Sequence, residues 1–469
     1  MIFNEDSTTR DDLAADAPHD DRIPTYVNAG QSYERDMRYV TTRITRDGRS
    51  GFKVEPGRYR LIAARACPWA NRTLIVRRLL GLEDVLSVGM PGPTHDARSW
   101  TFDLDPDGKD PVLGYERLQE AYLALDPDYD LGITVPAIVD VTSGKLVTND
   151  FDQITRDFSS EWVDYHRPGA PRLWPEDQRE EMEAVMRRVF TEVNNGVYRC
   201  GFAGSQAHYE AAYTRLFDAL DWLEERLATR RYLMGDHITE ADVRLFTTLV
   251  RFDAVYHGHF KANRNKLTEM PVLWAYARDL FQTPGFGDTI DFQQIKEHYY
   301  IVHSDINPTR IVPAGPDLTG WLEPHGREAL SDSPWGEGTA PGPVRDAERV
   351  SSGHNPLYPA RSTSGSPAFV KEGSEPTRVC RSRARAWDRP CDSRTRTDGE
   401  LSTAASVRPR NRELRTQSKQ LSGLDTREQI APKRGVSASL LRQWLDRSRC
   451  ENRDRACEID LVADNTRLG

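Results

Sequence analysis

Residues 58–80 read RYRLIAARACPWANRTLIVRRLL, and this stretch decides how the chain folds. Its first part is a short apolar run of the kind that forms a buried strand. Its last part repeats apolar residues at helical spacing as far as Leu80. Cys67 lies at the junction, and Pro68 suits the first helical turn, where a missing N–H leaves no hydrogen bond unmade. The stretch therefore predicts a strand that leads directly into a helix, with a cysteine at the helix start.

The position of Cys67 favours a reactive thiolate. A thiol at a helix N-terminus faces unpaired N–H groups and the positive end of the helix dipole, and the thiolate is the nucleophilic form. We expect Arg72, one helical turn further on, to add positive charge and to help lower the thiol pKa. Position 70 holds Ala70 rather than a second cysteine, so Cys67 can form only a mixed disulfide that an external thiol resolves. The alternative is a buried structural cysteine, but the proline that follows favours the reactive interpretation.

The charge is divided unevenly along the chain. The 469 residues carry 63 basic and 72 acidic side chains, a net charge of −9. Residues 345–469 hold 25 basic and 17 acidic side chains, which leaves 38 basic and 55 acidic in residues 1–344, a net charge of −17. Because this body is acidic, nucleic acid is not expected as its partner, and the mixed signs in the tail weaken the case there.

Cysteine use and hydropathy indicate a compartment. Of the six cysteines only Cys67 and Cys200 precede residue 345, and none has the Cys-x-x-Cys spacing of a zinc site. Two cysteines make no disulfide framework, which fits a reducing cytoplasm. No apolar stretch approaches the roughly 18 residues of a membrane span, and the polar N-terminus lacks the apolar centre of a signal peptide. We therefore expect a cytoplasmic protein with no membrane span and no metal site.

The order of predicted elements divides the chain into four parts. Residues 1–54 are a polar arm without sustained periodicity. Residues 55–162 follow the order of an α/β thioredoxin-like domain. Its elements are the strand and helix around Cys67, a second strand at 84–89, a long insertion at 91–130, a β-hairpin within 134–148 and a helix from 151 to about 158. In that order Val135 and Pro136 would face the helix start at Cys67, and the bond before Pro136 is a candidate for a cis peptide.

The second half of the body changes to helical periodicity. Within residues 163–325 the predicted helices span 176–193, 207–228, 239–255 and 270–281. Thr239 and Asp242 open the third helix as a variant of the capping box. Residues 326–469 are rich in Arg, Ser, Pro and Gly, so we expect a low-complexity, mostly disordered tail. The chain is thus predicted as a thioredoxin-like domain followed by an all-helical domain.

With these motifs in hand, the chain resembles the glutathione transferase superfamily, and within it the glutathionyl-hydroquinone reductases of the Xi class. The resemblance covers about residues 35–325 and rests on several motifs in order, which makes it specific. The motifs are Cys67-Pro68-Trp69-Ala70, Trp100-Thr101-Phe102, Thr134-Val135-Pro136, Asn194-Asn195-Gly196-Val197-Tyr198, Arg251-Phe252-Asp253 through His259-Phe260-Lys261, and His298-Tyr299-Tyr300 with Ile306-Asn307-Pro308.

The resemblance implies an enzyme with no bound cofactor. In that family a cysteine thiolate, here Cys67, attacks the sulfur of a thiol-conjugated hydroquinone, and a second thiol molecule resolves the mixed disulfide. Tyr198 and Tyr299 match tyrosines that would donate to the quinol oxygen, although plain packing is an alternative for both. Trp100 matches a residue of the thiol site, and the backbone of Val135 would pair with the cysteinyl part of the substrate. The family also implies a homodimer.

Two departures from the family pattern concern the thiol. Asn71 stands where the family usually has His. After Asn149, the Glu-Ser pair that grips the γ-glutamyl group of glutathione is replaced by Asp150 and Phe151. Asp150 keeps a carboxylate on a side chain one methylene shorter, whereas Phe151 has no hydroxyl. This variant resembles the actinobacterial type, which implies that the co-substrate is glutathione or mycothiol, a sugar-linked cysteine thiol, and that mycothiol is used better.

Two other classes of function compete with this interpretation. A glutathione-conjugating transferase would hold a substrate thiolate with Ser or Tyr, whereas a cysteine favours thiol exchange. A non-catalytic binding module of the same fold is the second alternative. Such a module does not need Cys67 together with Pro68 and Val135-Pro136, and their presence therefore favours the enzyme.

Overall fold

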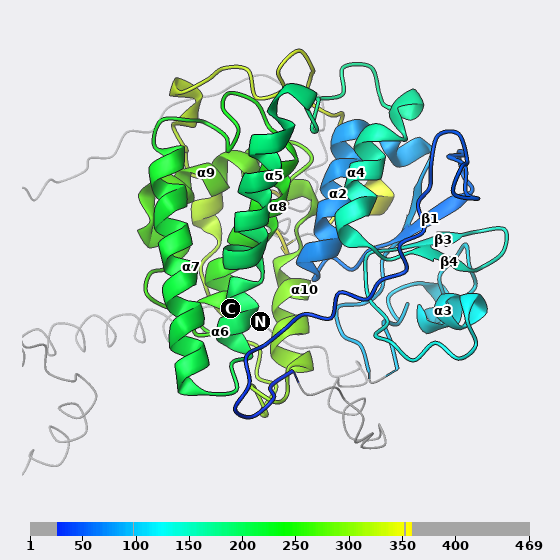
Figure 1. The fold of residues 1–469 in the computed structure, drawn as a ribbon, viewed down its shortest axis with the longest axis horizontal. Helices are drawn as coiled ribbons and strands as arrows, with labels where there is room; N and C mark the ends of the chain where they lie inside the picture. Colours follow the sequence, from blue (N-terminus) through cyan, green and yellow to red (C-terminus); the bar gives the residue numbers. More distant parts are fainter. Residues whose placement is uncertain (1–25, 97, 351–352, 359–469) are drawn as a thin grey trace, which may run out of the picture. The chain divides into compact units, whose positions relative to one another are not determined.

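The stretch around Cys67 builds the centre of a four-stranded sheet in the computed structural model, which describes residues 26–96, 98–350 and 353–358. The strands lie in the order β2-β1-β3-β4, with β1 and β2 parallel and the other two pairs antiparallel. Their bounds are β1 Tyr59–Ile62, β2 Ser87–Gly89, β3 Ala137–Asp140 and β4 Leu146–Thr148. A parallel pair extended by an antiparallel hairpin is the thioredoxin-like arrangement that the sequence predicts, and Figure 1 shows its strands β1, β3 and β4.

Helices cover this small sheet. They are α2 Pro68–Leu80, α3 Gln119–Leu125 and α4 Phe151–Ser160. In the register, Leu61 of β1 lies opposite Val88 on one side and Ile138 on the other, and every residue of β1 and β3 is buried. α2 packs against α4 and also against α8 (Glu240–Leu249) of the second domain, and all 13 residues of α2 are buried. α2 ends at Gly81, whose φ of 74° favours glycine.

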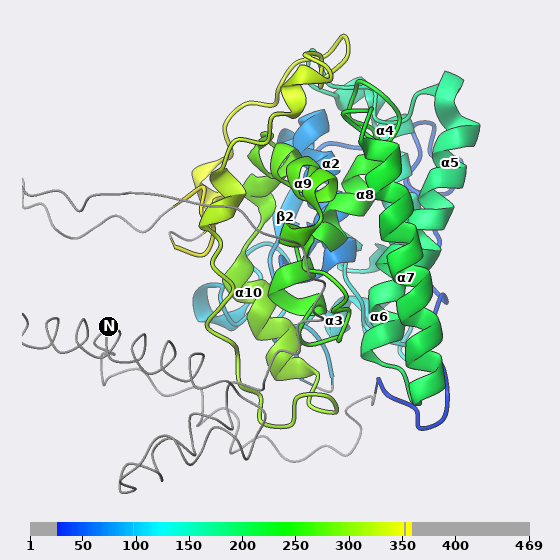
Figure 2. The same cartoon turned by 90° about the vertical axis from the view of Figure 1, so that its left-hand side faces the viewer.

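A helical domain follows α4. Its helices are α5 Arg179–Arg188, α6 Gly196–Gly201, α7 Gln206–Leu227, α8 Glu240–Leu249, α9 Pro271–Gln282 and α10 Phe292–Glu297 (Figure 2). The capping box at the start of α8 is confirmed, because the N–H of Thr239 donates to the Asp242 carboxylate over 2.8 Å. α8 ends earlier than predicted and is followed by a π-helical turn at Phe252–Tyr256. None of the helices in the described part of the chain is long and apolar enough to cross a membrane.

Residues 26–54 form an extended arm that crosses from the helical domain to the sheet (Figure 1). The N–H of Gly30 donates to the carbonyl of Gly204, just before α7, over 2.8 Å. Further along the arm, the N–H of Val40 donates to Oδ1 of Asn149, just after β4, over 2.7 Å. The arm is therefore attached to both domains rather than to one of them.

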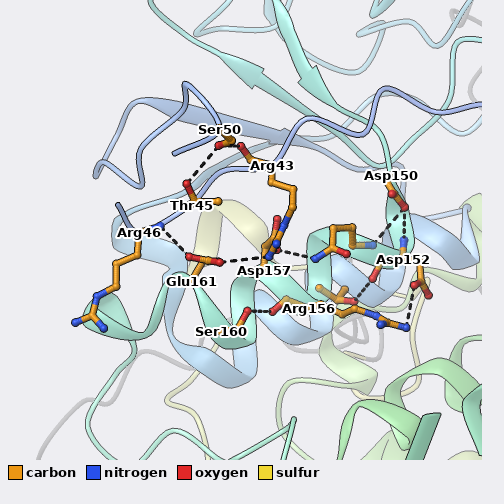
Figure 3. Close-up of polar contacts among 12 residues, drawn as sticks. Arg43, Thr45, Arg46, Ser50, Asp150, Asp152, Arg156, Asp157, Ser160 and Glu161 are labelled. Carbon is orange, nitrogen blue, oxygen red and sulfur yellow. Dashed lines mark hydrogen bonds and ion pairs between the residues drawn. The ribbon is translucent and has the colours of Figure 1, made fainter. Parts of the chain in front are cut away.

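The far end of the arm is tied to α4 by charged side chains (Figure 3). Nε of Arg43 donates to the Asp157 carboxylate over 3.0 Å, and the backbone N–H of Arg46 donates to the Glu161 carboxylate over 3.0 Å. Ser50 closes the turn between them by donating to the carbonyl of Arg43 over 2.6 Å. Asp157 is buried, so its pairing with Arg43 fixes the path of the arm along α4.

The chain after α10 returns over the body, on the side away from α5 (Figure 2, yellow). The buried guanidinium of Arg327 donates to the carbonyl of Arg231 over 2.8 Å. The two terminal nitrogens of Arg77 donate to the Glu348 carboxylate over 2.7 and 2.9 Å, and Asn355 donates to two carbonyls of the body over 2.6 and 2.8 Å. The sequence prediction of a disordered tail from residue 326 therefore places its start too early, because polar anchors rather than apolar periodicity fix this segment.

Residues 359–469 lie outside the described residues, and the domain boundaries after 54 and 162 stay predictions.

Candidate active site

Cys67 is the N-cap residue of α2 and lines a cavity. Its side chain is 8% exposed, and its Sγ donates to the carbonyl of Val135 over 3.5 Å. The bond between Val135 and Pro136 is cis, as the sequence predicts. The junction between β1 and α2 and the segment before β3 thus place the thiol against a short length of extended backbone.

Arg251 of the helical domain fixes the junction that carries Cys67. Its fully buried guanidinium donates to the carbonyls of the two residues before Cys67 over 2.9 and 3.1 Å, and to Oδ1 of Asn71 over 3.2 Å. Asn71 in turn donates to Oγ1 of Thr289 over 2.8 Å. The asparagine that departs from the family pattern therefore links α2 to the helical domain.

Burial raises the pKa of the Cys67 thiol above its ordinary value, and the sequence prediction of a lowered pKa is wrong for the free protein. Two backbone N–H groups in the first turn of α2 oppose this shift, followed by the charges of Arg251 and Arg35. Arg72, expected to supply positive charge here, instead donates to Oδ1 of Asn194 over 2.7 Å. The helix start acts on the sulfur as expected, but the loss of hydration outweighs it.

The cavity has a volume of about 630 Å³ and is bounded by both domains and the arm. Six of the predicted site residues line it, namely Cys67, Trp100, Val135, Phe151, Tyr198 and Tyr299. Pro136, Asn149 and Asp150 do not belong to its lining. The long insertion between β2 and β3 contributes a wall through Trp100 and its neighbours, which gives that loop a function in shaping the site.

Three tyrosine hydroxyls form a chain that ends in the cavity. Tyr198 and Tyr299 join through their hydroxyl oxygens over 2.6 Å, and Tyr256 joins Tyr299 over 2.9 Å. Burial raises the pKa of all three hydroxyls, so all are protonated near neutral pH. Two of the three hydroxyl protons are donated in the two hydrogen bonds between the tyrosines. If Tyr256 donates to Tyr299 and Tyr299 donates to Tyr198, the Tyr198 O–H remains free to donate into the cavity.

Trp100 stacks on a histidine of the helical domain. The rings of Trp100 and His298 lie 5.0 Å apart at 15°, and Nδ1 of His298 donates to the carbonyl of Pro93 over 2.8 Å. Burial lowers the pKa of His298 to about 3, so the ring is neutral near pH 7. Among the described residues, no group of three His, Cys, Asp or Glu side chains could hold a metal ion.

At the start of α4, Asn149 and Asp150 make structural hydrogen bonds, whereas Phe151 lines the cavity. Asn149 donates to Oγ1 of Thr134 over 2.9 Å and holds the arm, and the Asp150 carboxylate caps α4 by accepting from two backbone N–H groups over 3.2 and 3.3 Å (Figure 3). The ring of Phe151 lies 4.6 Å from that of Trp69 and 5.5 Å from that of Tyr39. At this end the cavity therefore presents aromatic rings rather than a carboxylate.

The arm supplies a wall that sequence reasoning missed. Tyr26, Tyr33, Arg35 and Tyr39 all line the cavity. Nothing in the arm's periodicity says which domain these side chains would meet. The spacing of Tyr33 and Arg35 was the one available signal, because residues two apart on an extended chain share a face.

Two family models match the chain, one over each domain. Residues 66–161 match the N-terminal domain of glutathione S-transferases, and residues 206–279 match their C-terminal domain. Both matches agree with the thioredoxin-like sheet, the cysteine at the start of α2 and the helical domain behind it. The chain belongs to the glutathione S-transferase superfamily and is an enzyme of it.

The curated relatives narrow this class. The glutathionyl-hydroquinone reductase PcpF of Sphingobium chlorophenolicum is 44% identical over 272 residues, which cover 57% of this chain and 85% of PcpF. The glutathionyl-hydroquinone reductase YqjG of Escherichia coli K12 is 38% identical over 311 residues, which cover 64% of this chain and 94% of YqjG. The chain is a thiol-dependent reductase of the glutathione transferase type and belongs with the glutathionyl-hydroquinone reductases.

Solved structures agree with this assignment. A glutathione transferase from Gordonia bronchialis is 70% identical with a TM-score of 0.68, and the match covers 69% of this chain and all of that one. A Xi-class transferase from Natrialba magadii is 40% identical with a TM-score of 0.61, over 64% of this chain and 94% of that one. The YqjG structure was solved with glutathione bound and is 39% identical with a TM-score of 0.58, over 61% of this chain and 94% of that one.

Proposed function

We propose that this enzyme removes the thiol from thiol-conjugated hydroquinones, with Cys67 as the nucleophile. The observation that carries the proposal is that one cavity is lined by two kinds of reactive group. These are a cysteine at a helix start and, on the helical-domain side, the chain of tyrosine hydroxyls that ends at Tyr198. The names of PcpF and YqjG support the same reaction.

The reaction takes place in two exchanges at sulfur. The Cys67 thiolate attacks the sulfur of the conjugate, an S–S bond forms, and the bond from that sulfur to the ring carbon breaks. The electron pair of the broken bond passes to the ring, which takes up a proton and leaves as the free hydroquinone. A second thiol molecule then attacks the mixed disulfide, releases the disulfide of the two thiols and restores Cys67.

The other predicted site residues take positioning roles in this scheme. Tyr198 donates a hydrogen bond to the quinol oxygen, and Tyr299 keeps the Tyr198 hydroxyl oriented through the 2.6 Å contact. The backbone of Val135, opposite the sulfur, pairs with the cysteinyl part of the thiol, and Trp100 bounds the thiol site. Pro136 shapes the segment that carries Val135.

Replacing Cys67 tests the proposal. Cys67→Ser should abolish the release of hydroquinone from a thiol conjugate, because the serine hydroxyl forms no disulfide. Cys200→Ala is the matched control, since Cys200 is buried, does not line the cavity, and has its pKa raised by burial to about 12. Full activity of Cys67→Ala would remove this mechanism.

We also propose that the thiol is mycothiol rather than glutathione. Phe151 offers no hydroxyl to the γ-glutamyl carboxylate, and Asp150 uses its carboxylate as the α4 cap. The neighbouring wall of Phe151, Trp69 and Tyr39 rings suits the C–H face of a sugar better than a pair of charged groups. One lost charge-assisted hydrogen bond costs roughly 1.5–3 kcal/mol, or about 10- to 150-fold in binding.

The thiol is identified by comparing kcat/KM for one naphthohydroquinone conjugated to each thiol. We expect the mycothiol conjugate to be turned over better, and Asp150→Glu with Phe151→Ser to shift the preference toward glutathione. Equal or better use of the glutathione conjugate by the unmodified enzyme would overturn this choice of thiol and leave the reductase proposal intact.

A homodimer and a cytoplasmic location are further proposals that rest on the family and on cysteine use. A glutathione-conjugating transferase remains the second candidate function, and the tyrosine hydroxyl at the cavity favours it in part. Net consumption of a free thiol with formation of a thioether would identify that activity.

A further inference from the structure

The Arg35 side chain, carried by the arm, reaches into the cavity beside the catalytic stretch. Its Nε donates to Oδ1 of Asn195 over 2.8 Å. Its guanidinium carbon lies 4.3 Å from the ring centroid of Trp69 and 4.7 Å from that of Tyr198. Arg35 is therefore held between the residue two places after Cys67 and the end of the tyrosine chain.

The pair Asn194-Asn195 holds two arginines against one indole. Asn194 accepts from Arg72, whose guanidinium carbon lies 4.5 Å from the Trp69 centroid, just as Asn195 accepts from Arg35. Of these two arginines only Arg35 lines the cavity. This arrangement accounts for both asparagines of the motif and, of the two arginines, leaves Arg35 where a ligand can meet it.

The charge of Arg35 is incompletely satisfied in the free enzyme. Its Nη2 is buried without a hydrogen-bond partner, and Arg35 forms no ion pair among the described residues. The nearby Asp36 carboxylate pairs with Arg38 over 2.6 Å instead. A buried guanidinium N–H without an acceptor is costly, and an oxyanion that supplied one would recover that free energy.

We propose that Arg35 binds an oxyanion of the conjugate, either the phenolate oxygen of the hydroquinone or, where the thiol carries one as glutathione does, a carboxylate of the thiol. This inference rests on the proposed function, because it assigns a ligand group to the same cavity. Because Arg35 contacts Tyr198, it lies beside the place that the proposed scheme gives to the quinol oxygen. Because it also contacts Trp69, it lies within reach of the thiol. Arginine stays protonated at any working pH, so the contact persists across the pH range of the enzyme.

The test compares Arg35→Met with the unmodified enzyme on two conjugates of one naphthohydroquinone. One conjugate carries glutathione, which has carboxylates, and the other carries N-acetylcysteamine, which has none. Loss of roughly 10- to 150-fold in kcat/KM on both conjugates assigns the quinol oxygen, and a loss on the glutathione conjugate alone assigns the carboxylate. Arg35→Lys keeps the positive charge but lacks the paired N–H donors of the guanidinium, so it should recover part of the lost kcat/KM.

Arg38→Met is the matched control, because Arg38 lies three residues along the same arm, is exposed and does not line the cavity. Arg35→Met within about threefold of this control on both conjugates would overturn the inference. If the unmodified enzyme turns over neither of these conjugates nor the mycothiol conjugate, the proposed function fails instead. In that case binding is measured directly by calorimetry. The affinity of Cys67→Ser for each of the two conjugates is compared with that of the double variant Cys67→Ser, Arg35→Met. A weaker affinity of the double variant would show that Arg35 binds the conjugate, and equal affinities would overturn the inference.

Discussion

Cys67 combines a position that suits a thiolate with surroundings that oppose one. Two N–H groups of α2 and the charges of Arg251 and Arg35 favour the ionised sulfur, but burial outweighs them in the free protein. The sequence could predict the helix start from Pro68 and the apolar spacing. It could not predict the burial of the sulfur or the direction of Arg72, because both depend on the second domain and the arm.

The raised pKa of Cys67 has a consequence for reactivity. The thiol is protonated near neutral pH, and the thiolate forms as the pH rises through the raised pKa. Alkylation of Cys67 by iodoacetamide, followed by peptide mass, should therefore increase about tenfold per pH unit and still be increasing at about pH 8.5, the ordinary cysteine pKa. A plateau reached by neutral pH would contradict this account of the site.

At the scale of elements, the segment after α10 supports the helix that carries the cysteine. Glu348 pairs with Arg77, a residue of α2 that is only 1% exposed, and the backbone carbonyl of Glu348 accepts from Arg65. Because Arg65 lies two residues before Cys67, this contact joins the segment to the β1–α2 junction.

Truncation separates this segment from the rest of the tail. A chain ending at residue 358 should keep the melting temperature and activity of the full chain. A chain ending at residue 345 leaves Arg77 buried without its carboxylate, which costs roughly 3–5 kcal/mol. Thermal unfolding of both truncations, with Glu348→Gln in the full chain, measures this loss. Equal melting temperatures for the two truncations would show that the contact contributes nothing.

Elements with a full apolar period were predictable, and short ones were not. The stretch at 58–80 and the long helix α7 repeat apolar residues over several turns, so the sequence predicts their type of secondary structure. α6 and α10 have six residues each, too few to show a period, and each adjoins a π-helical turn. The segment after residue 326 is fixed by single polar anchors, which no periodicity reveals.

At the scale of the whole body, the site exists only where three parts of the chain meet. The thioredoxin-like domain supplies Cys67 and Val135, the helical domain supplies Tyr198 and Tyr299, and the arm supplies Arg35. The first four were reachable from the sequence, through the helix start and the family motifs. Arg35 was not, because its contact with Asn195 spans 160 residues and neither partner belongs to a periodic pattern.

The central claim is that the Cys67 sulfur takes the thiol from the conjugate. It is tested most directly by mixing the full-length enzyme with one equivalent of a thiol-conjugated hydroquinone, without free thiol, and measuring the mass of the Cys67 peptide. The account predicts a disulfide-linked thiol on Cys67, one equivalent of released hydroquinone, and loss of the adduct when thiol is added. Release of hydroquinone with Cys67 unmodified, or a hydroquinone bonded to Cys67, would contradict it.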